Sequence, residues 1–253
     1  MIEVSGIHKI FGGLVAIDNL SFSVKENEIF SIIGPNGAGK TTLFNILSGV
    51  YKPDTGKILF EGKDITGLKP HVVAQKGLVR TFQLTTVFAQ STVLENLTIA
   101  YRLRTKSNIF DTVFGSSRSR RAERQAQEKA QEVLEFIELK DSCNKMASLT
   151  TQEEQKRLSI GIALATDPKV VMLDEPAGGL NPQEMDGIMS LIYKVKEKGI
   201  TVCLIEHKMR IVMQISDRIM ALNYGQKISE GTANEVSNDE KVIQAYLGVD
   251  FVA

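Results

Sequence analysis

The chain has 253 residues, and 30 lysines and arginines balance 30 aspartates and glutamates, so its formal net charge is zero. Hydrophobic residues make up 43% and charged residues 24%, an ordinary composition for a globular protein with a sizeable core. The zero balance argues against a protein that coats nucleic acid, although uncharged backbone amides can still form a local phosphate site. Two cysteines and three histidines exclude a disulfide scaffold and a Cys/His zinc cluster.

The sequence shows no sign of a membrane span or a secretory signal. No stretch approaches the roughly 20 apolar residues that cross a bilayer. The first residues include Glu3 and lack an apolar signal core. We therefore expect the chain to stay in the reducing compartment where it is made and to meet a membrane only through a partner. Cys203, in an apolar run, is expected to be a buried, reduced thiol.

Short apolar runs alternate with helical patterns, which is typical of a parallel sheet covered by helices. In chain order, the predicted elements are a strand at Glu28–Ile33, a helix at Lys40–Leu47, and strands at Lys57–Phe60, Val170–Leu173, Ile200–Ile205, Arg218–Leu222 and Lys227–Ser229. The strands at Lys57–Phe60 and Arg218–Leu222 are expected to be antiparallel additions. Asn181 and Pro182 suit the cap and first residue of a helix that Gly199 ends.

The middle of the chain differs, because strand signals fade from about Leu84 to Thr166 and charged helical patterns take over. Gly115 and Ser116–Ser119 indicate a loop with arginines at its edge. These arginines favour a solvated helix start over a nucleic-acid or lipid contact. We expect a discontinuous core whose two parts flank a helical subdomain, with boundaries at 1–83, 84–166 and 167–253.

The most informative stretch, Gly34–Thr41, fulfils the phosphate-loop motif G-x-x-x-x-G-K-[ST] between a predicted strand and a predicted helix. The glycines let backbone amides point at phosphate oxygens, and the helix N-terminus adds partial positive charge. Lys40 is suited to the β- and γ-phosphates and Thr41 to Mg²⁺. The alternative is a glycine-rich turn that only caps a helix, but the complete motif in this context predicts nucleoside triphosphate binding. The predicted binding residues are Gly34, Pro35, Asn36, Gly37, Ala38, Gly39, Lys40, Thr41 and Thr42.

A second apolar run ends in two carboxylates, Asp174 and Glu175. Asp174 is suited to hold Mg²⁺ through water, and Glu175 to polarise the attacking water as a general base. The alternative, two acids that merely start a loop, does not explain the uniformly apolar run before them. The predicted fold is therefore α/β: a phosphate-loop NTPase core with a mostly parallel sheet, an N-terminal antiparallel β part and an inserted α-helical subdomain.

With these motifs the chain resembles, over nearly its whole length, the ATP-binding subunits of ABC transporters. Arg80–Gln83 is similar to the family's Q-loop, which implies that Gln83 contacts Mg²⁺ and the attacking water. Ala177–Asn181 resembles the D-loop, and His207 resembles the switch histidine that contacts the γ-phosphate. Phe11 lies where the family places an aromatic ring on adenine, although a single Phe before a turn is more often a core residue.

Within the family, the chain is most similar to the ATPase subunits of branched-chain amino-acid importers. The segments that carry this resemblance are Phe11–Ala16, Arg80–Gln83, Thr92–Leu97, Glu175–Pro182 and Ile205–Met209. The resemblance implies import of hydrophobic amino acids or related amides, at the cytoplasmic face of the membrane. It also implies transmembrane permease subunits that dock near the Q-loop, a second ATPase subunit and, indirectly, an extracytoplasmic substrate-binding protein. No nucleic-acid partner is expected.

One family feature is degenerate. ABC ATPases enclose ATP between one subunit's phosphate loop and the partner's signature segment, usually LeuSerGlyGlyGln, whereas this chain has Ser148–Arg157 without either glycine. The residues expected to face a partner's ATP are Thr150, Thr151, Gln152 and Glu153. Thr150 with Glu153, and Thr151 with Glu154, both fit a helix capping box, so the register stays open. Two glutamates in a first helical turn oppose an approaching phosphate, so we expect a weak signature face and favour a heterodimer over a homodimer.

Two other functions stay open. A regulatory or assembly module would bind nucleotide with weak turnover; the degenerate signature favours it, whereas the intact Lys40, Asp174, Glu175 and His207 argue against it. A translation- or repair-associated ABC protein typically carries two ATPase domains or a coiled-coil insertion. This sequence has one set of motifs and no sustained heptads.

Overall fold

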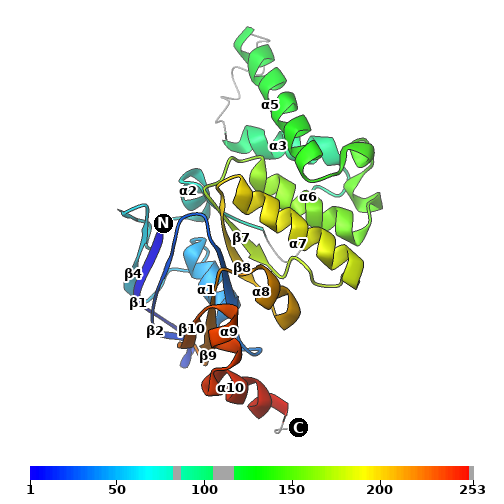
Figure 1. Ribbon diagram of the computed structural model, residues 1–253. Coiled ribbons are helices and arrows are strands. Elements are labelled where there is room, and N and C mark those ends of the chain that lie inside the picture. The colour runs from blue at the N-terminus through cyan, green and yellow to red at the C-terminus, as the bar shows by residue number, and fades with distance from the viewer. Residues whose placement is uncertain (82–86, 105–116, 251–253) are drawn as a thin grey trace. The chain divides into compact units, whose positions relative to one another are not determined.

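The computed structural model describes residues 1–81, 87–104 and 117–250 (Figure 1). The chain forms two compact units, each assembled from segments that are distant in sequence. The first unit comprises Met1–Arg80, Lys169–Pro176 and Ile192–Ala253, and the second comprises Thr81–Pro168 and Ala177–Leu191. No helix among the described residues combines the length and the apolar character needed to span a bilayer.

The first unit contains an antiparallel sheet in the order β2-β1-β4-β5. Its strands are β1 (Ile2–Phe11), β2 (Leu14–Val24), β4 (Thr55–Phe60) and β5 (Lys63–Asp64). Strands β1 and β2 form a hairpin in which Phe11 pairs with Leu14 across Gly12 and Gly13. The predicted N-terminal antiparallel part is confirmed, and β4 joins it antiparallel to β1 as expected.

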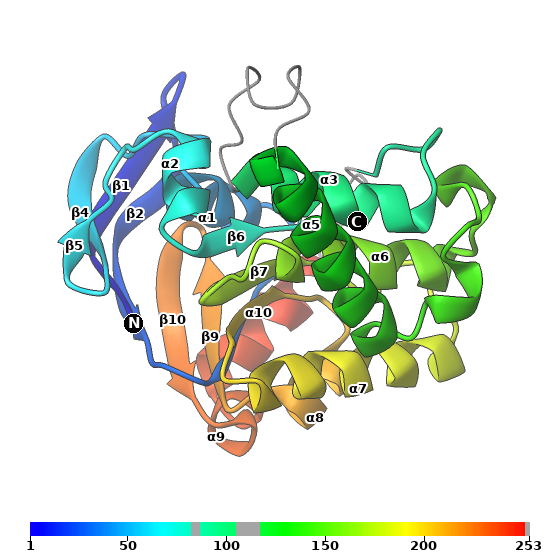
Figure 2. The same ribbon diagram turned by 90° about the horizontal axis from the view of Figure 1, so that it is seen from above.

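A second sheet of the same unit has the order β10-β9-β3-β8-β7-β6, and Figure 2 shows β9 beside β10. Its strands are β3 (Ile29–Ile33), β6 (Leu78–Arg80), β7 (Val170–Asp174), β8 (Thr201–Ile205), β9 (Arg218–Asn223) and β10 (Gln226–Gly231). Neighbouring strands are parallel except β9 and β10, which confirms the mostly parallel sheet. The prediction that Arg218–Leu222 is an antiparallel addition is wrong, because β9 runs parallel to β3 and only β10 reverses.

The core of the first unit is packed by side chains from both sheets and from α1 (Lys40–Leu47). Strands β3, β7 and β8 are buried at every position, which explains their largely apolar sequences. Phe30 and Phe44 are fully buried, and truncating such a ring to alanine typically costs about 3–5 kcal/mol of stability. Cys203 is 1% exposed, so its prediction as a buried thiol is confirmed. Further helices of this unit are α2 (Pro70–Gln75), α8 (Met209–Ile215), α9 (Ala233–Ser237) and α10 (Glu240–Asp250).

The second unit is helical. It contains α3 (Val93–Arg104), α5 (Ser117–Phe136), α6 (Gln152–Leu164) and the first part of α7 (Pro182–Glu197). Gly161 of α6 is packed so closely that a Cβ would lie 2.6 Å from Ile137 Cδ1. The prediction of a loop through Ser119 is wrong, because α5 already begins at Ser117; Gly115 and Ser116 lie outside the described residues.

Helix α7 begins as the sequence predicts. The side chain of Asn181 accepts a hydrogen bond from the amide of Glu184, and the Glu184 carboxylate accepts one from the amide of Asn181. Pro182 is the first residue of the helix. Gly199, with a φ of 82°, follows the helix and ends it with a left-handed turn.

Candidate nucleotide-binding site

Three neighbouring strands of the parallel sheet bring the predicted site together. Ile205 at the end of β8 pairs with Ile32 of β3 on one side and with Asp174 of β7 on the other. Because these strands are parallel, the segments that follow them meet at the same edge of the sheet. That edge carries the phosphate loop after β3, the carboxylates at the end of β7 and His207 after β8.

Two glycines of the phosphate loop are required by close backbone contacts. A Cβ on Gly34 would lie 2.1 Å from the carbonyl oxygen of Leu222, and one on Gly39 would lie 2.6 Å from the carbonyl oxygen of Ala16. Gly39 has a φ of 102° and is the N-cap of α1 without a side-chain cap. The first amides of α1 therefore have no side chain of the N-cap bonded to them and face the site as anion donors.

The Lys40 side chain folds back onto the phosphate loop. Its ammonium donates hydrogen bonds to the carbonyl oxygens of Gly34 at 2.6 Å and Pro35 at 2.9 Å. Burial lowers the pKa of Lys40, while the charges of Glu175 and Asp174 act in the opposite direction. This opposition means that the lysine and both carboxylates lie within electrostatic reach of one another, as a phosphate and metal site requires.

The remaining predicted loop residues differ in exposure. Asn36, Gly37 and Thr41 are exposed, whereas Ala38 is buried and Thr42 lies between these extremes. The amide of Ala38 donates to the carbonyl oxygen of Pro35 at 3.2 Å, which closes the loop as a tight turn. Asn36, Gly37 and Thr41 are thus open to solvent, whereas the buried Ala38 anchors the turn.

Asp174 is held by a buried ion pair. Its Oδ2 accepts a hydrogen bond from Arg80 Nη2 at 2.7 Å, and the two side chains are 1% and 5% exposed. None of the described residues hydrogen-bonds to the other carboxylate oxygen, Oδ1, although it is buried. A buried anionic oxygen needs a partner, so this atom fits a role as a Mg²⁺ ligand through water.

The donor set suits Mg²⁺ rather than a metal cage made by the protein. No group of three or more His, Cys, Asp or Glu side chains in the described ranges forms a metal cluster. Mg²⁺ is usually held by one or two protein oxygens together with phosphates and waters. Asp174 Oδ1 and the hydroxyl group of the exposed residue Thr41 fit this pattern, whereas Gln83, the third predicted ligand, lies outside the described residues.

Glu175 and His207 face each other at the end of β7 and β8. His207 Nδ1 lies 3.6 Å from Glu175 Oε1, and the Glu175 amide donates to the Ile205 carbonyl oxygen at 2.9 Å. Glu175 has a φ of 48°, a left-handed conformation that is unfavourable for a residue with a side chain. The buried carboxylate of Glu206 accepts a hydrogen bond from the His207 amide at 3.1 Å, which fixes the start of the His207 loop.

Phe11 is an exposed ring rather than a core residue. It is 40% exposed and forms a T-shaped pair with Tyr51, with ring centroids 5.2 Å apart. Lys9 Nζ lies 5.2 Å from the Phe11 ring centroid and also pairs with Asp54 at 2.8 Å. Because this much of Phe11 is exposed, the interpretation as a core residue is wrong.

In the helical unit, the structure resolves the register of the degenerate segment. Thr151 is the N-cap of α6, and its side chain accepts from the amide of Glu154, whose carboxylate accepts from the amide of Thr151. Thr150 is buried instead and donates to the carbonyl oxygen of Ala147 at 2.7 Å. The capping box is therefore Thr151 with Glu154, and Gln152 and Glu153 open the helix.

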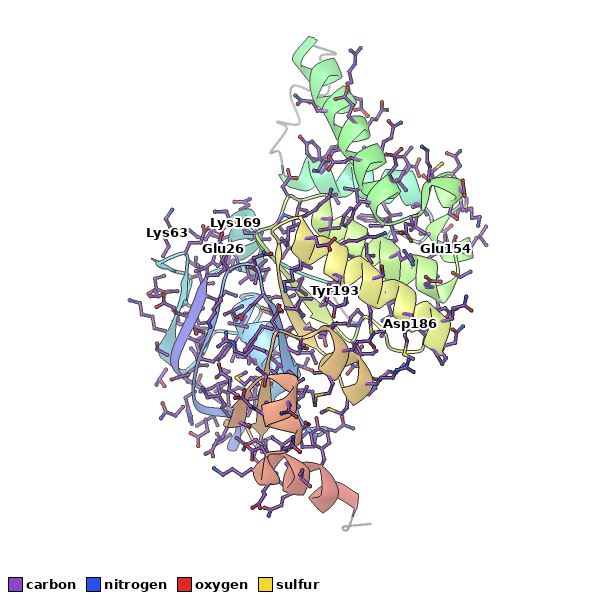
Figure 3. All side chains as sticks on the ribbon, in the orientation of Figure 1. Glu26, Lys63, Glu154, Lys169, Asp186 and Tyr193 are labelled. Atoms are coloured by element: carbon purple, nitrogen blue, oxygen red, sulfur yellow. The ribbon has the colours of Figure 1, made fainter. Side chains whose placement is uncertain are left out.

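Both glutamates of this first turn are already engaged. Glu153 pairs with Arg157 at 2.8 Å within α6. Although partial burial acts to raise it, the pKa of Glu154 is lowered by hydrogen bonds from Ser142 and Thr151 and by the charge of Lys145. Figure 3 labels Glu154 at this end of α6. The positive charges of Lys145 and Arg157 offset part of the negative charge that a phosphate would meet, so the repulsion is weaker than the sequence suggests.

Sequence reasoning missed three residues of the site. Arg80 was noted only as part of a motif, and its contact with Asp174 joins residues 94 positions apart. Asn45, one helical turn after Thr41, binds Arg80 Nη1 at 2.6 Å. Glu206 precedes the histidine, and only its complete burial reveals its role in holding the loop. A charged residue inside an otherwise apolar segment was the available signal for each of the two charged residues.

Comparisons with known proteins agree with this geometry. A sequence profile for ABC transporters matches residues 17–178, and one for branched-chain amino acid ATP-binding cassette transporters matches residues 226–252. Over 249 residues and 98% of both chains, identity is 43% to the high-affinity branched-chain amino acid transport ATP-binding protein BraF of Pseudomonas aeruginosa. Sequence identity is 42% to the high-affinity branched-chain amino acid transport ATP-binding protein LivG of Escherichia coli, again over 249 residues and 98% of both chains.

A crystal structure of an ABC transporter's ATP-binding cassette in its ADP conformation superposes with a TM-score of 0.86. That structure is 36% identical to this chain, and the match covers 98% of both. It confirms the predicted phosphate-loop NTPase fold, and its ADP conformation supports the binding of ATP. The chain therefore belongs to the ABC transporter family as an ATP-binding cassette.

Proposed function

We propose that this chain is the ATP-hydrolysing subunit of an importer for branched-chain or other hydrophobic amino acids, or related amides. The observation that carries the proposal is the joint position of the phosphate loop, Asp174–Glu175 and His207 at the ends of three adjacent parallel strands. The 43% identical relative, which is named for high-affinity branched-chain amino acid transport, supports the substrate class.

In this proposal the phosphate loop binds the triphosphate. The amides between Gly34 and Thr42 donate to phosphate oxygens, and Lys40 exchanges its bonds to two carbonyl oxygens for bonds to the β- and γ-phosphates. Phe11, which is 40% exposed, stacks on the adenine ring. Binding thus uses directed amides and one cation, which explains how a chain of zero net charge holds a polyanion.

The catalytic step uses the carboxylate after β7. Mg²⁺, when bound, supplies charge neutralisation at the phosphate oxygens, and Thr41, Gln83 and Asp174 are the residues that would hold it. Glu175 accepts a proton from the attacking water, and Gln83 helps to orient that water. His207 contacts the γ-phosphate, and its 3.6 Å separation from Glu175 keeps the two groups at one reacting centre.

We further propose that the chain works at the cytoplasmic face of the membrane with separate permease subunits, which dock near Gln83. A substrate-binding protein on the opposite side selects the substrate. The second ATPase subunit is a related chain with a normal signature rather than a second copy. The absence of both signature glycines between Ser148 and Arg157 supports this heterodimer, because side chains obstruct close backbone contact with phosphate.

The second candidate function is a regulatory or assembly module that binds ATP with little turnover. The first turn of α6 favours it, because Glu153 and Glu154 replace residues that would meet a partner's ATP closely. The complete set of catalytic groups favours hydrolysis instead. A heterodimer reconciles the two observations, since the partner's signature completes the ATP site of this chain.

The experiment compares ATP hydrolysis by wild-type protein and Glu175→Gln, alone and with its co-purified membrane partners. We expect the variant to keep its ATP affinity and to lose about 10²–10⁴-fold in kcat, the range for removal of a general base. Glu26→Gln, at an exposed carboxylate before β3, is the matched control and should retain full activity. Equal, slow turnover of wild type and Glu175→Gln in the presence of the partners would support the regulatory module instead.

A further inference from the structure

Arg80 is a buried arginine whose guanidinium joins two parts of the nucleotide site. Nη2 donates to Asp174 Oδ2 at 2.7 Å, and Nη1 donates to Asn45 Oδ1 at 2.6 Å. The guanidinium carbon also lies 5.6 Å from the ring centroid of Phe44 on the same helix as Asn45. One planar group therefore fixes strand β7 and helix α1 relative to each other.

These contacts make the two carboxylate oxygens of Asp174 differ in their hydrogen bonding. Oδ2 is held by Arg80, while the buried Oδ1 has no hydrogen-bond partner among the described residues. Rotation of the carboxylate would break a buried, charge-assisted hydrogen bond, which is unfavourable. Arg80 thus fixes the orientation of the Asp174 carboxylate and with it the position of Oδ1.

The contact with Asn45 has a second consequence. Asn45 and Thr41 are four residues apart in α1, so they lie on the same face of the helix. By holding Asn45, Arg80 also fixes the helical face that carries the Thr41 hydroxyl group. Both oxygen donors assigned to Mg²⁺ in the described ranges are thereby aligned by one side chain.

We propose that Arg80 is a positioning residue that aligns Asp174 and Thr41 for Mg²⁺, an inference that rests on the metal role given to Asp174 under the proposed function. Arg80 does not touch nucleotide or metal in this account. It acts on the geometry of the ligands, as residues that orient metal ligands commonly do. Its effect is therefore expected in the metal dependence of nucleotide binding rather than in nucleotide binding itself.

The test measures the affinity for ADP by calorimetry, once with Mg²⁺ and once with EDTA, so that no turnover is needed. The ratio of the two affinities reports on the metal alone. In Arg80→Lys the charge remains, but a single ammonium replaces the planar fork that binds Asp174 and Asn45 together. We expect this ratio to fall about 10-fold, while the affinity in EDTA stays unchanged.

Asn45→Ala is the second variant and keeps the ion pair with Asp174. It should lower the ratio less than Arg80→Lys, because only the tie to α1 is lost. The matched control is Arg218→Lys, since Arg218 is a partly buried arginine whose guanidinium also donates to two different side chains, Glu28 and Glu230, each at 2.6 Å. Its guanidinium lies 4.8 Å from the Phe30 ring, at the start of β9, away from the strand ends that carry the site.

The outcomes are distinct. A ratio unchanged in Arg80→Lys, or lowered equally in Arg218→Lys, overturns the positioning role, because general destabilisation then explains the result. Thermal unfolding of each variant shows whether stability losses are matched. Asp174→Asn distinguishes failure of the proposed metal role of Asp174 from failure of the inference on Arg80. If this variant keeps the full Mg²⁺ effect, the metal role of Asp174 fails, and the inference on Arg80 fails with it. If Asp174→Asn removes the effect and Arg80→Lys does not, only the inference on Arg80 is overturned.

Discussion

The ammonium of Lys40 donates a hydrogen bond to the carbonyl oxygen of Gly34 at 2.6 Å, across the base of the phosphate loop. The Lys40 ammonium is thus bound within the loop, and a phosphate must replace the carbonyl oxygens of Gly34 and Pro35 as its hydrogen-bond acceptors. This contact keeps the loop closed around a group of the right charge, so the cradle is formed before nucleotide arrives. Burial of the ammonium is unfavourable, and the negative charge of a bound phosphate offsets this unfavourable free energy.

Replacing Lys40 with methionine should weaken nucleotide binding without weakening the fold. The variant loses one or two charge-assisted hydrogen bonds to phosphate, which corresponds to about a 10- to 100-fold loss of ADP affinity. Because methionine avoids the burial of a charge, the thermal midpoint of the empty protein should stay equal or rise. Calorimetric titration with ADP and thermal unfolding provide the two measurements.

Lys196→Met is the control for this variant. Lys196 pairs with Asp217 at 2.6 Å in the same unit and belongs to no part of the phosphate loop. Its loss should leave ADP affinity unchanged. A normal affinity in Lys40→Met would show that the amides alone carry phosphate binding.

Nucleotide binding should take up protons at alkaline pH. Burial lowers the pKa of Lys40 from its usual 10.5, against the effect of Glu175 and Asp174, so part of the lysine is neutral just below that pH. Phosphate favours the charged form and raises the pKa again, which requires a proton from solvent. Between the lowered pKa and 10.5 the unfolded chain holds more protons, so the contribution of Lys40 to stability rises with pH there.

Titration with ADP at about pH 9.5 in two buffers of different ionisation enthalpy measures this uptake. The apparent binding enthalpies should differ in the direction of proton uptake and coincide in Lys40→Met. Identical enthalpies for the wild-type protein in both buffers would contradict the prediction.

Local sequence patterns predicted the elements of the site more completely than their contacts. The phosphate loop and the pair Asp174–Glu175 come at the ends of largely apolar strands, and burial on both faces of a parallel sheet favours such sequences. The predicted direction of β9 was wrong, because a short apolar run such as Ile219–Leu222 reads the same in either orientation. Only its pairing with β3 on one side and β10 on the other decides it.

The roles of Arg80 and Thr151 needed the fold. Arg80 meets Asp174 across 94 positions, a separation that no local pattern encodes. Thr150 and Thr151 each had a glutamate three residues later, so two capping boxes were equally compatible with the sequence. The choice depends on which hydroxyl group is buried: Thr150 is used inside the preceding turn, which leaves Thr151 to cap α6.

The two cysteines should react very differently with an alkylating reagent. Burial, reinforced by the charge of Glu28, raises the pKa of the Cys203 thiol to about 12, whereas Cys143 is only half-buried. At about pH 8 the folded protein then holds on the order of 1 in 10,000 Cys203 thiols as thiolate. Mass spectrometry after brief iodoacetamide treatment should find modification at Cys143 and none at Cys203.

In denaturant both thiols should react at similar rates, which is the internal control for this labelling. The raised pKa means that the folded state keeps the Cys203 proton longer than the unfolded chain, so this contribution to stability is lost as pH rises from 9.0 towards 12. Fast labelling of Cys203 in the folded protein would show that β8 opens locally.

The charge at the start of α6 can be separated from its cap. Glu154→Gln removes a charge yet keeps an oxygen that accepts from the Thr151 amide, and Glu153→Gly removes the other charge together with a side chain. In the hydrolysis-deficient Glu175→Gln background, the double change should raise the ATP-driven dimer fraction of the purified chain. Analytical ultracentrifugation with ATP measures that fraction.

Thr232→Ala is the control, because it removes the matching capping box of α9 with Glu235 and leaves the signature segment intact. It should lower the free energy of unfolding by about 1 kcal/mol and leave the dimer fraction unchanged. The ion pair of Glu153 with Arg157 and the contacts of Glu154 already weaken the repulsion, so the gain from the double change is expected to be modest, about 3- to 10-fold in the dimer constant. An unchanged dimer fraction would mean that the missing glycines, and not the two charges, limit the signature face.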